Sequence, residues 1–191
     1  NIREGFHALF ALVHYRGSDR AAEIAEASIA FLLELWKPKN GWDWDRLESE
    51  FGLRASKDHT FITGIARAIG PLAKYYTATQ HGPALELAII LASKAMDEFF
   101  LSDGIYDPKK FGTHTHSTTC VMSSLAQLAD ITSDLSMLER VKAFYDNGLR
   151  EIRDEIGWVI ENSNDNSPPD RGECNNTGDI IETALIMGRY G

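Results

Sequence analysis

The stretch that decides the fold is "TTCVMSSLAQLA" at residues 118–129. Small and apolar residues occupy nearly every side of this segment, which is typical of a helix that neighbouring helices cover all round. The stretch that follows, "TSDLSMLERVKAFYDNGLREI" at 132–152, has apolar residues on one face and charged residues on the other. Together the two stretches predict an inner helix and an outer helix joined by a short turn.

This helical pair recurs along the chain at nearly constant spacing. Apolar first helices are predicted to begin near Ile2, Thr60, Thr118 and Thr177, at offsets of 58, 58 and 59 residues. Shared pattern and spacing, rather than sequence identity, carry this repeat. We therefore expect helical hairpins at about residues 2–36, 60–100, 118–156 and 177–191, the last of them truncated.

Repeated helical hairpins predict an all-α fold. We expect an α/α toroid, a ring of roughly six hairpins, of which residues 1–191 supply about three and a third. In this interpretation the chain is a single domain that is incomplete at both ends. A superhelical solenoid of hairpins is the alternative.

The connections between helices are unequal in length. They are brief within each pair, but long between pairs, at about residues 37–59, 101–117 and 157–176. Because each pair runs up and back, we expect the long connections to gather at one end of the domain. Long loops on a rigid scaffold are where functional sites are usually built.

Composition excludes several classes of partner. The net charge is −9 and the chain has no block of lysines and arginines, which argues against nucleic acid. No apolar run approaches the 18 residues that could cross a bilayer, so we expect no membrane partner.

The two cysteines are too few for a disulfide framework or a four-thiolate zinc site. The compartment and the oligomeric state stay open.

Each long connection ends in polar residues immediately before an inner helix. We expect these residues to line one mouth, where helix N-termini favour anionic or polyhydroxyl ligands. They are Asp58, His59, His114, His116, Glu173, Asn175 and Asn176. The alternative is that some of them only start helices: Ser117 and Asn176 are predicted N-caps, and Asp179 completes a motif like a capping box.

Other loop residues could contact a sugar. Aromatic faces beside carboxylates are typical of sugar binding, and the predicted binding residues therefore include Trp42, Trp44 and Tyr106. Arg171, two positions before Glu173, is a further predicted binding residue. Further carboxylates in or beside the mouth are Asp43, Asp45 and Asp170.

Two motifs resemble the six-hairpin glycosidase superfamily, most nearly the helical domain of glycoside hydrolase family 127, the β-L-arabinofuranosidases. They are "HTHSTTCVMSSLAQLADITSD" at 114–134 and "GECNNTGDIIETAL" at 172–185. The resemblance implies an α/α toroid that hydrolyses a terminal sugar, with Glu173 matching the motif's glutamate. The family's zinc is held by that glutamate, a cysteine two positions later and a further cysteine pair. Here Cys174 directly follows Glu173 and position 175 is Asn. Of that ligand set the chain offers only Glu173 and Cys174, and we expect no metal or other cofactor.

The predicted function is therefore glycoside hydrolysis of a carbohydrate substrate. It requires two carboxyl groups, for which we expect Glu173 as the acid and Asp58 as its partner, with His116 orienting the sugar. A sugar epimerase or polysaccharide lyase is the first alternative, in which His114, His116 or Tyr106 would transfer the proton. A non-catalytic domain that binds glycan or protein is the second.

Overall fold

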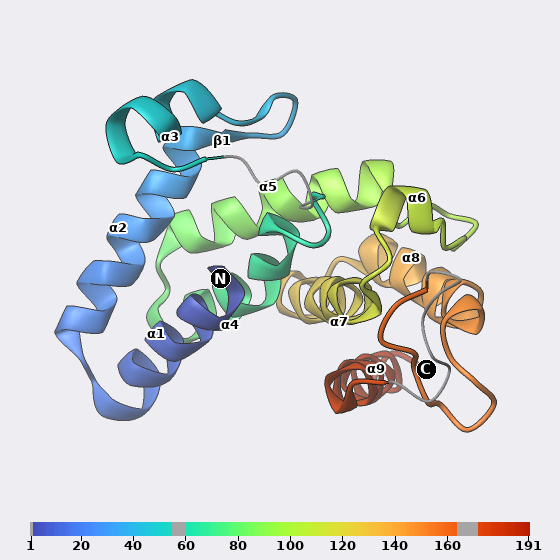
Figure 1. The fold of residues 1–191 in the computed structure, drawn as a ribbon. Helices are drawn as coiled ribbons and strands as arrows, with labels where there is room; N and C mark the ends of the chain where they lie inside the picture. The colour runs from blue at the N-terminus through green and yellow to red at the C-terminus, as the bar shows by residue number, and fades with distance from the viewer. Residues whose placement is uncertain (1, 55–59, 164–171) are drawn as a thin grey trace.

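The computed structural model describes residues 2–54, 60–163 and 172–191 (Figure 1). Over these ranges the regular secondary structure is helical apart from isolated bridges and one short hairpin, in which β1 (Trp36–Lys37) pairs with β2 (Gly41–Trp42). The all-α class is thus confirmed. No helix in the described ranges is long and apolar enough to cross a membrane. The helices are α1 (Ile2–Arg16), α2 (Asp19–Leu35), α3 (Trp44–Phe51), α4 (Ile69–Thr79), α5 (Gly82–Glu98), α6 (Pro108–Phe111), α7 (Thr115–Thr132), α8 (Leu135–Asp146) and α9 (Cys174–Met187).

Three helix pairs, α1/α2, α4/α5 and α7/α8, turn in the same way. The first helix of each pair is followed by one residue with left-handed backbone: Gly17, Gln80 and Ser133, at φ 59°, 59° and 57°. The next residue then caps the second helix. In two pairs its side chain accepts a bond from a first-turn N–H, from Ala21 to Ser18 and from Met137 to Asp134. The hairpins share little sequence identity, but the backbone conformation of their turns recurs in all three pairs.

The first helices of the pairs form an inner row. Helices α1, α4, α7 and α9 pack side by side in that order, while α2 and α5 pack against each other outside them. Fourteen of the eighteen residues of α7 are buried. Its partner α8 buries one face only, through Met137, Leu138, Val141 and Phe144. This difference agrees with the inner and outer positions predicted for the two stretches.

Three inner helices begin elsewhere than predicted. Helix α7 begins at Thr115 and α9 at Cys174, in each case three residues before the predicted start. Helix α4 begins at Ile69 rather than near residue 60, after a 3₁₀ turn, η1, at Ile65–Ala68. Pro71 accounts for this late start, because proline has no N–H to donate to the carbonyl four residues earlier and is tolerated only in a first turn.

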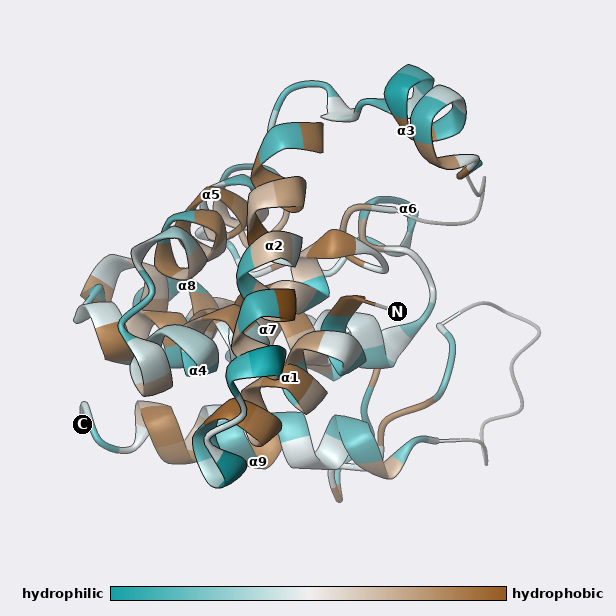
Figure 2. Ribbon diagram, turned by 90° about the vertical axis from the view of Figure 1, so that its left-hand side faces the viewer, coloured by the Kyte–Doolittle hydropathy of each residue, from teal (hydrophilic) through white to brown (hydrophobic). Residues whose placement is uncertain are grey.

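The long connections contact one another at one end of the inner row. The Thr60 hydroxyl donates to the Phe111 carbonyl at 3.4 Å, and Ser163 N–H donates to the Thr113 carbonyl at 2.9 Å. The β1–β2 hairpin and the largely hydrophilic α3, which belong to the first long connection, do not lie with the other connections at that end of the inner row. They extend from the end of α2 and lie far from α9 in both views (Figures 1 and 2).

We predict that Gly104→Ala destabilises the fold by about 3 kcal/mol or more. Gly104 lies between α5 and α6 at φ 66°, and an added Cβ would lie 2.1 Å from the Ala143 carbonyl oxygen. Gly17→Ala is the matched control, since Gly17 has φ 59° but open space around it. It should lose only about 1 kcal/mol, for backbone strain. Urea unfolding measures both free energies, and equal losses would contradict the steric argument.

Candidate functional site

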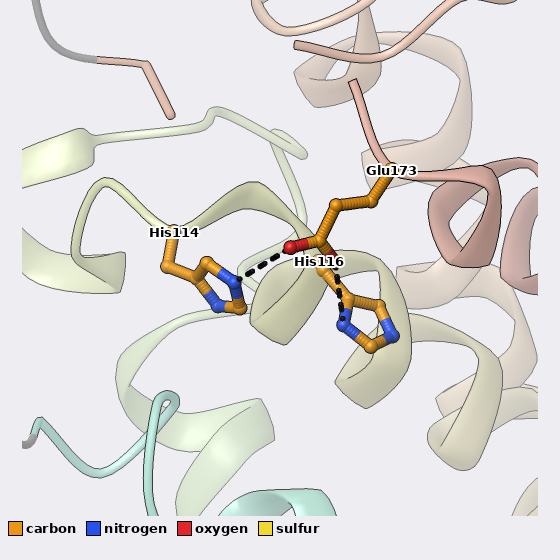
Figure 3. Close-up of side chains that lie close together, drawn as sticks. All are labelled: His114, His116 and Glu173. Carbon is orange, nitrogen blue, oxygen red and sulfur yellow. Dashed lines mark hydrogen bonds and ion pairs between the residues drawn. The ribbon is translucent and has the colours of Figure 1, made fainter. Parts of the chain in front are cut away.

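Two helix starts bring three polar side chains together (Figure 3). His114 is the N-cap of α7, His116 lies in the first turn of that helix, and Glu173 is the N-cap of α9. His114 Nε2 lies 3.4 Å from Glu173 Oε1, and His116 Nδ1 lies 3.1 Å from Glu173 Oε2. The histidines and the glutamate are distant in sequence, but they meet because α7 and α9 pack side by side with their first residues adjacent.

His114 is the more accessible of the two histidines. Its side chain is 37% exposed, and its Nδ1 lies 2.8 Å from the Ser117 hydroxyl. The backbone around it is tied to the last long connection, because His114 pairs with Asn162 in a β-bridge. The ring therefore has a fixed orientation while keeping one edge toward solvent.

His116 is almost fully buried, with its side chain 5% exposed. Burial, together with the positive charges of Arg3 and Arg67, lowers the pKa of His116 to about 4, although Glu173 opposes this shift. The imidazole is therefore neutral at pH 7 and carries one N–H. Its Nε2 has no hydrogen-bond partner among the described residues and faces Asp179 Oδ2 at 3.6 Å, slightly beyond hydrogen-bond length.

A buried polar network lies behind His116 and joins α7 to α9. The Thr119 hydroxyl is 2.8 Å from Asn176 Oδ1 and 3.0 Å from Asp179 Oδ2. Asn176 is fully buried and also donates to the Thr115 hydroxyl at 3.4 Å. Burial raises the pKa of Asp179 to about 6, against the opposing effects of Thr119 and Arg3.

This network shows that the predicted capping roles were wrong. The N-caps are His114 and Glu173 rather than Ser117 and Asn176, and neither side chain bonds its helix backbone. Asn176 and Asp179 face α7 instead of their own helix start. Bonds between helices in the buried interface thus take precedence over a local capping preference, since a buried amide or carboxyl without partners is costly.

The two cysteines differ in environment. Cys120 is buried on α7, and burial raises the pKa of its thiol, with Arg3 opposing the shift. A protonated, enclosed thiol does not fit the role of nucleophile or thiolate ligand. Cys174 is exposed in the first turn of α9.

The other predicted site residues lie apart from the cluster or outside the described ranges. Tyr106 is buried, and its hydroxyl lies 3.0 Å from the Gly112 carbonyl and 2.7 Å from the Ser163 hydroxyl, which does not fit contact with a ligand. Trp42 packs against the core beside β1, whereas Trp44 is 41% exposed on α3. Asn175 is exposed one position beyond Cys174. Asp58, His59, Asp170 and Arg171 lie outside the described residues.

Two of the further carboxylates have other positions. Asp43 caps α3, accepting a bond from the Arg46 N–H at 3.2 Å, and Asp45 is exposed in the first turn of the same helix. Since α3 extends away from α9, neither carboxylate joins the cluster.

Sequence reasoning missed three residues that support the cluster: Ser117, Thr119 and Arg3. A signal for Thr119 was present, because it lies one helical turn after His116 and so shares its face of α7. Arg3 had no such signal, since only tertiary packing brings α1 near the start of α7.

The arrangement offers a carboxylate that is oriented at both oxygens yet still reachable. Glu173 is 29% exposed, and the two imidazoles hold it from one side. Such a group can accept a proton, bind sugar hydroxyls or ligate a cation.

We predict that Thr119→Val lowers the free energy of unfolding by about 2 kcal/mol, because Asn176 and Asp179 lose a buried partner. Thr118→Val is the control. The Thr118 hydroxyl is buried without a partner among the described residues, so its loss should change stability by less than about 0.5 kcal/mol. Equal effects in urea unfolding would contradict the role assigned to the network.

We also predict a pH dependence of stability from His7 on α1. Burial, with Arg3 and Lys74, lowers its pKa from 6.5 to about 4. The unfolded chain therefore takes up this proton first as the pH falls, and stability is lost between about pH 6.5 and pH 4. The His7→Gln variant should show a smaller loss than the wild type over this window. His14→Gln, at an exposed position, is the control. Parallel stability curves for wild type and His7→Gln would contradict the prediction.

Comparisons with known proteins leave the site to be interpreted from its chemistry. No protein-family model, no curated protein and no solved structure matches this chain. A helical fold alone does not determine function. The inference of function therefore rests on the side chains that the two helix starts bring together.

Proposed function

We propose that this chain is part of a carbohydrate-active enzyme, a glycoside hydrolase that acts on a terminal sugar. The observation that carries the proposal is the Glu173 carboxylate, held at its two oxygens by His114 and His116 and exposed on its remaining side. Glycoside hydrolysis depends on a carboxylate fixed in orientation beside the scissile bond. Glu173 is the described residue that fits this requirement best.

The surroundings of Glu173 favour an ionised role over the acid role expected from the sequence. A catalytic carboxylic acid is typically kept protonated by apolar surroundings. Glu173 instead faces two imidazole nitrogens and solvent. We therefore assign it as the base or the nucleophile, the role in which an ionised carboxylate activates water or attacks the sugar.

The acid would then be a second carboxyl group. Asp58, the candidate from the sequence, lies outside the described residues. Asp179 has a pKa raised to about 6, which suits an acid, but its side chain is 12% exposed and faces His116 on the side away from Glu173. This position does not fit contact with a sugar. We therefore move the acid role, which the sequence analysis gave to Glu173, to its predicted partner Asp58.

The proposal includes the α/α toroid as the scaffold. Three observations support it: the inner row α1, α4, α7 and α9, the identical turns of the hairpins, and the contacts among long connections near the start of α7. In a ring of this kind the cluster would lie at the mouth near the axis. The negative net charge and the absence of a basic block fit a neutral sugar better than a polyanion.

Proton transfer by an epimerase or lyase is the second candidate, and the accessibility of His114 favours it. A histidine oriented by a carboxylate is a common general base. His114 has this arrangement with Glu173 and is partly exposed. Tyr106, the other proposed base, is already hydrogen bonded in the interior.

The test is a screen of the full-length protein against aryl glycosides and unsaturated uronides. We expect turnover of an aryl glycoside, and a loss of roughly 100- to 10,000-fold in Glu173→Gln, which removes the charge but keeps the shape. Glu155→Gln, at an exposed glutamate outside the cluster, should behave as wild type.

Other outcomes would overturn the assignment. Full aryl glycoside turnover by Glu173→Gln would exclude Glu173 as the catalytic carboxylate. Activity confined to uronides and lost in His114→Gln would favour proton transfer instead. If a well-folded wild type turned over neither class, the non-catalytic binding domain would become the better interpretation.

A further inference from the structure

The Glu173 cluster brings two imidazoles and a carboxylate to one point, the ligand types that zinc prefers in proteins. One ligand atom from each of His114, His116 and Glu173 lies within 4.8 Å of the other two. We propose that these three side chains bind a divalent transition-metal ion of the zinc class. The proposed ligands are His114 Nε2, His116 Nδ1 and a Glu173 oxygen.

The outer contacts of the two histidines fit this assignment. His114 Nδ1 lies 2.8 Å from the Ser117 hydroxyl, and His116 Nε2 faces Asp179 Oδ2 at 3.6 Å. Metal-binding histidines typically donate their other ring N–H to such oxygens, which fixes the tautomer and the ring orientation. With the protons on these outer nitrogens, both inner nitrogens present lone pairs to the Glu173 carboxylate. In these tautomers the three inner atoms are all acceptors, and a cation between them would satisfy all three.

The spacing of the inner atoms is close to that of a zinc site. Ligand atoms about 2.0–2.1 Å from a tetrahedral zinc ion lie roughly 3.4 Å from one another. The two nitrogen–oxygen distances to Glu173 are 3.4 and 3.1 Å, each to a different carboxylate oxygen, and the three ligand atoms lie within 4.8 Å of one another. Side-chain rotations that bring these atoms closer together would complete the coordination of an ion.

Three protein ligands leave a coordination position open. Sites with this ligand number usually hold water or substrate in the remaining position, whereas structural zinc sites have four protein ligands. His114 and Glu173 are partly exposed, so the open position would face solvent. Cys174 is exposed beside Glu173 and is not among the three grouped ligands, and neither cysteine has a part in the proposal.

Metal binding does not rest on the proposed glycosidase activity, because it can be measured without a sugar. If the ion binds, Glu173 is occupied as a ligand, and the loss of turnover in Glu173→Gln would arise through the metal. Turnover by a protein that binds no ion would overturn the metal site and leave the glycosidase proposal intact. Metal binding without turnover would support the metal site and count against the glycosidase proposal.

The experiment is a titration of the chelator-treated, full-length protein with Co²⁺ and with Zn²⁺. Co²⁺ is followed by its visible d–d absorption, and Zn²⁺ by competition with a chromophoric chelator. We expect one ion per chain in the wild type and in His14→Gln, an exposed histidine outside the cluster. Affinity should fall at least about 100-fold in Glu173→Gln and in His114→Gln. Ser117→Ala, which removes only the outer partner of His114, should weaken binding about 10-fold.

Circular dichroism of each metal-free variant separates loss of a ligand from loss of the fold. Absence of stoichiometric binding by the folded wild type would overturn the proposal. Equal weakening in His14→Gln and His114→Gln would also overturn it, because binding would then be adventitious. Should His114→Gln fail to fold, the metal affinities of Glu173→Gln and Ser117→Ala still decide whether the cluster binds the ion.

Discussion

The site depends on the buried contact between α7 and α9. Thr119 on one helix meets Asn176 and Asp179 on the other, and all three side chains are buried. Sliding one helix along the other would leave these groups without partners, at a cost of about 1–3 kcal/mol each. Apolar packing would tolerate several registers, whereas hydrogen bonds of fixed length select one. That register places Glu173 opposite His114 and His116.

Burial divides the cluster into an enclosed part and a solvent-accessible part. His116 lies inside, where the loss of hydration and the charges of Arg3 and Arg67 keep it neutral. Glu173 and His114 lie at the surface, where they keep contact with water. In the hydrolase proposal the interior side chain can therefore set the orientation of the carboxylate without itself meeting the sugar. Binding and catalytic residues often lie on loops that a rigid scaffold positions.

The two proposals for Glu173 share one physical requirement, an oriented anionic carboxylate, and differ in what neutralises it. In the hydrolase proposal, His114 or His116 donates its N–H to the carboxylate. In the metal proposal the same nitrogens carry lone pairs, and their protons point outward to Ser117 and Asp179. The choice is one of tautomer, and heavy-atom positions alone are compatible with both.

The sequence by itself determined the helical class, the hairpin repeat, the inner position of α7, and the placement of His114, His116 and Glu173 near the starts of inner helices, because periodicity and loop length are local properties of the chain. Helix boundaries and roles within the site were decided by tertiary structure. Pro71 delayed α4, and the α7–α9 interface drew Asn176 and Asp179 away from capping. Tyr106 was likewise enclosed by contacts with Ser163 that no pattern near it could reveal. Burial and hydrogen bonding between distant segments are set by packing, and packing exists only once the helices have assembled.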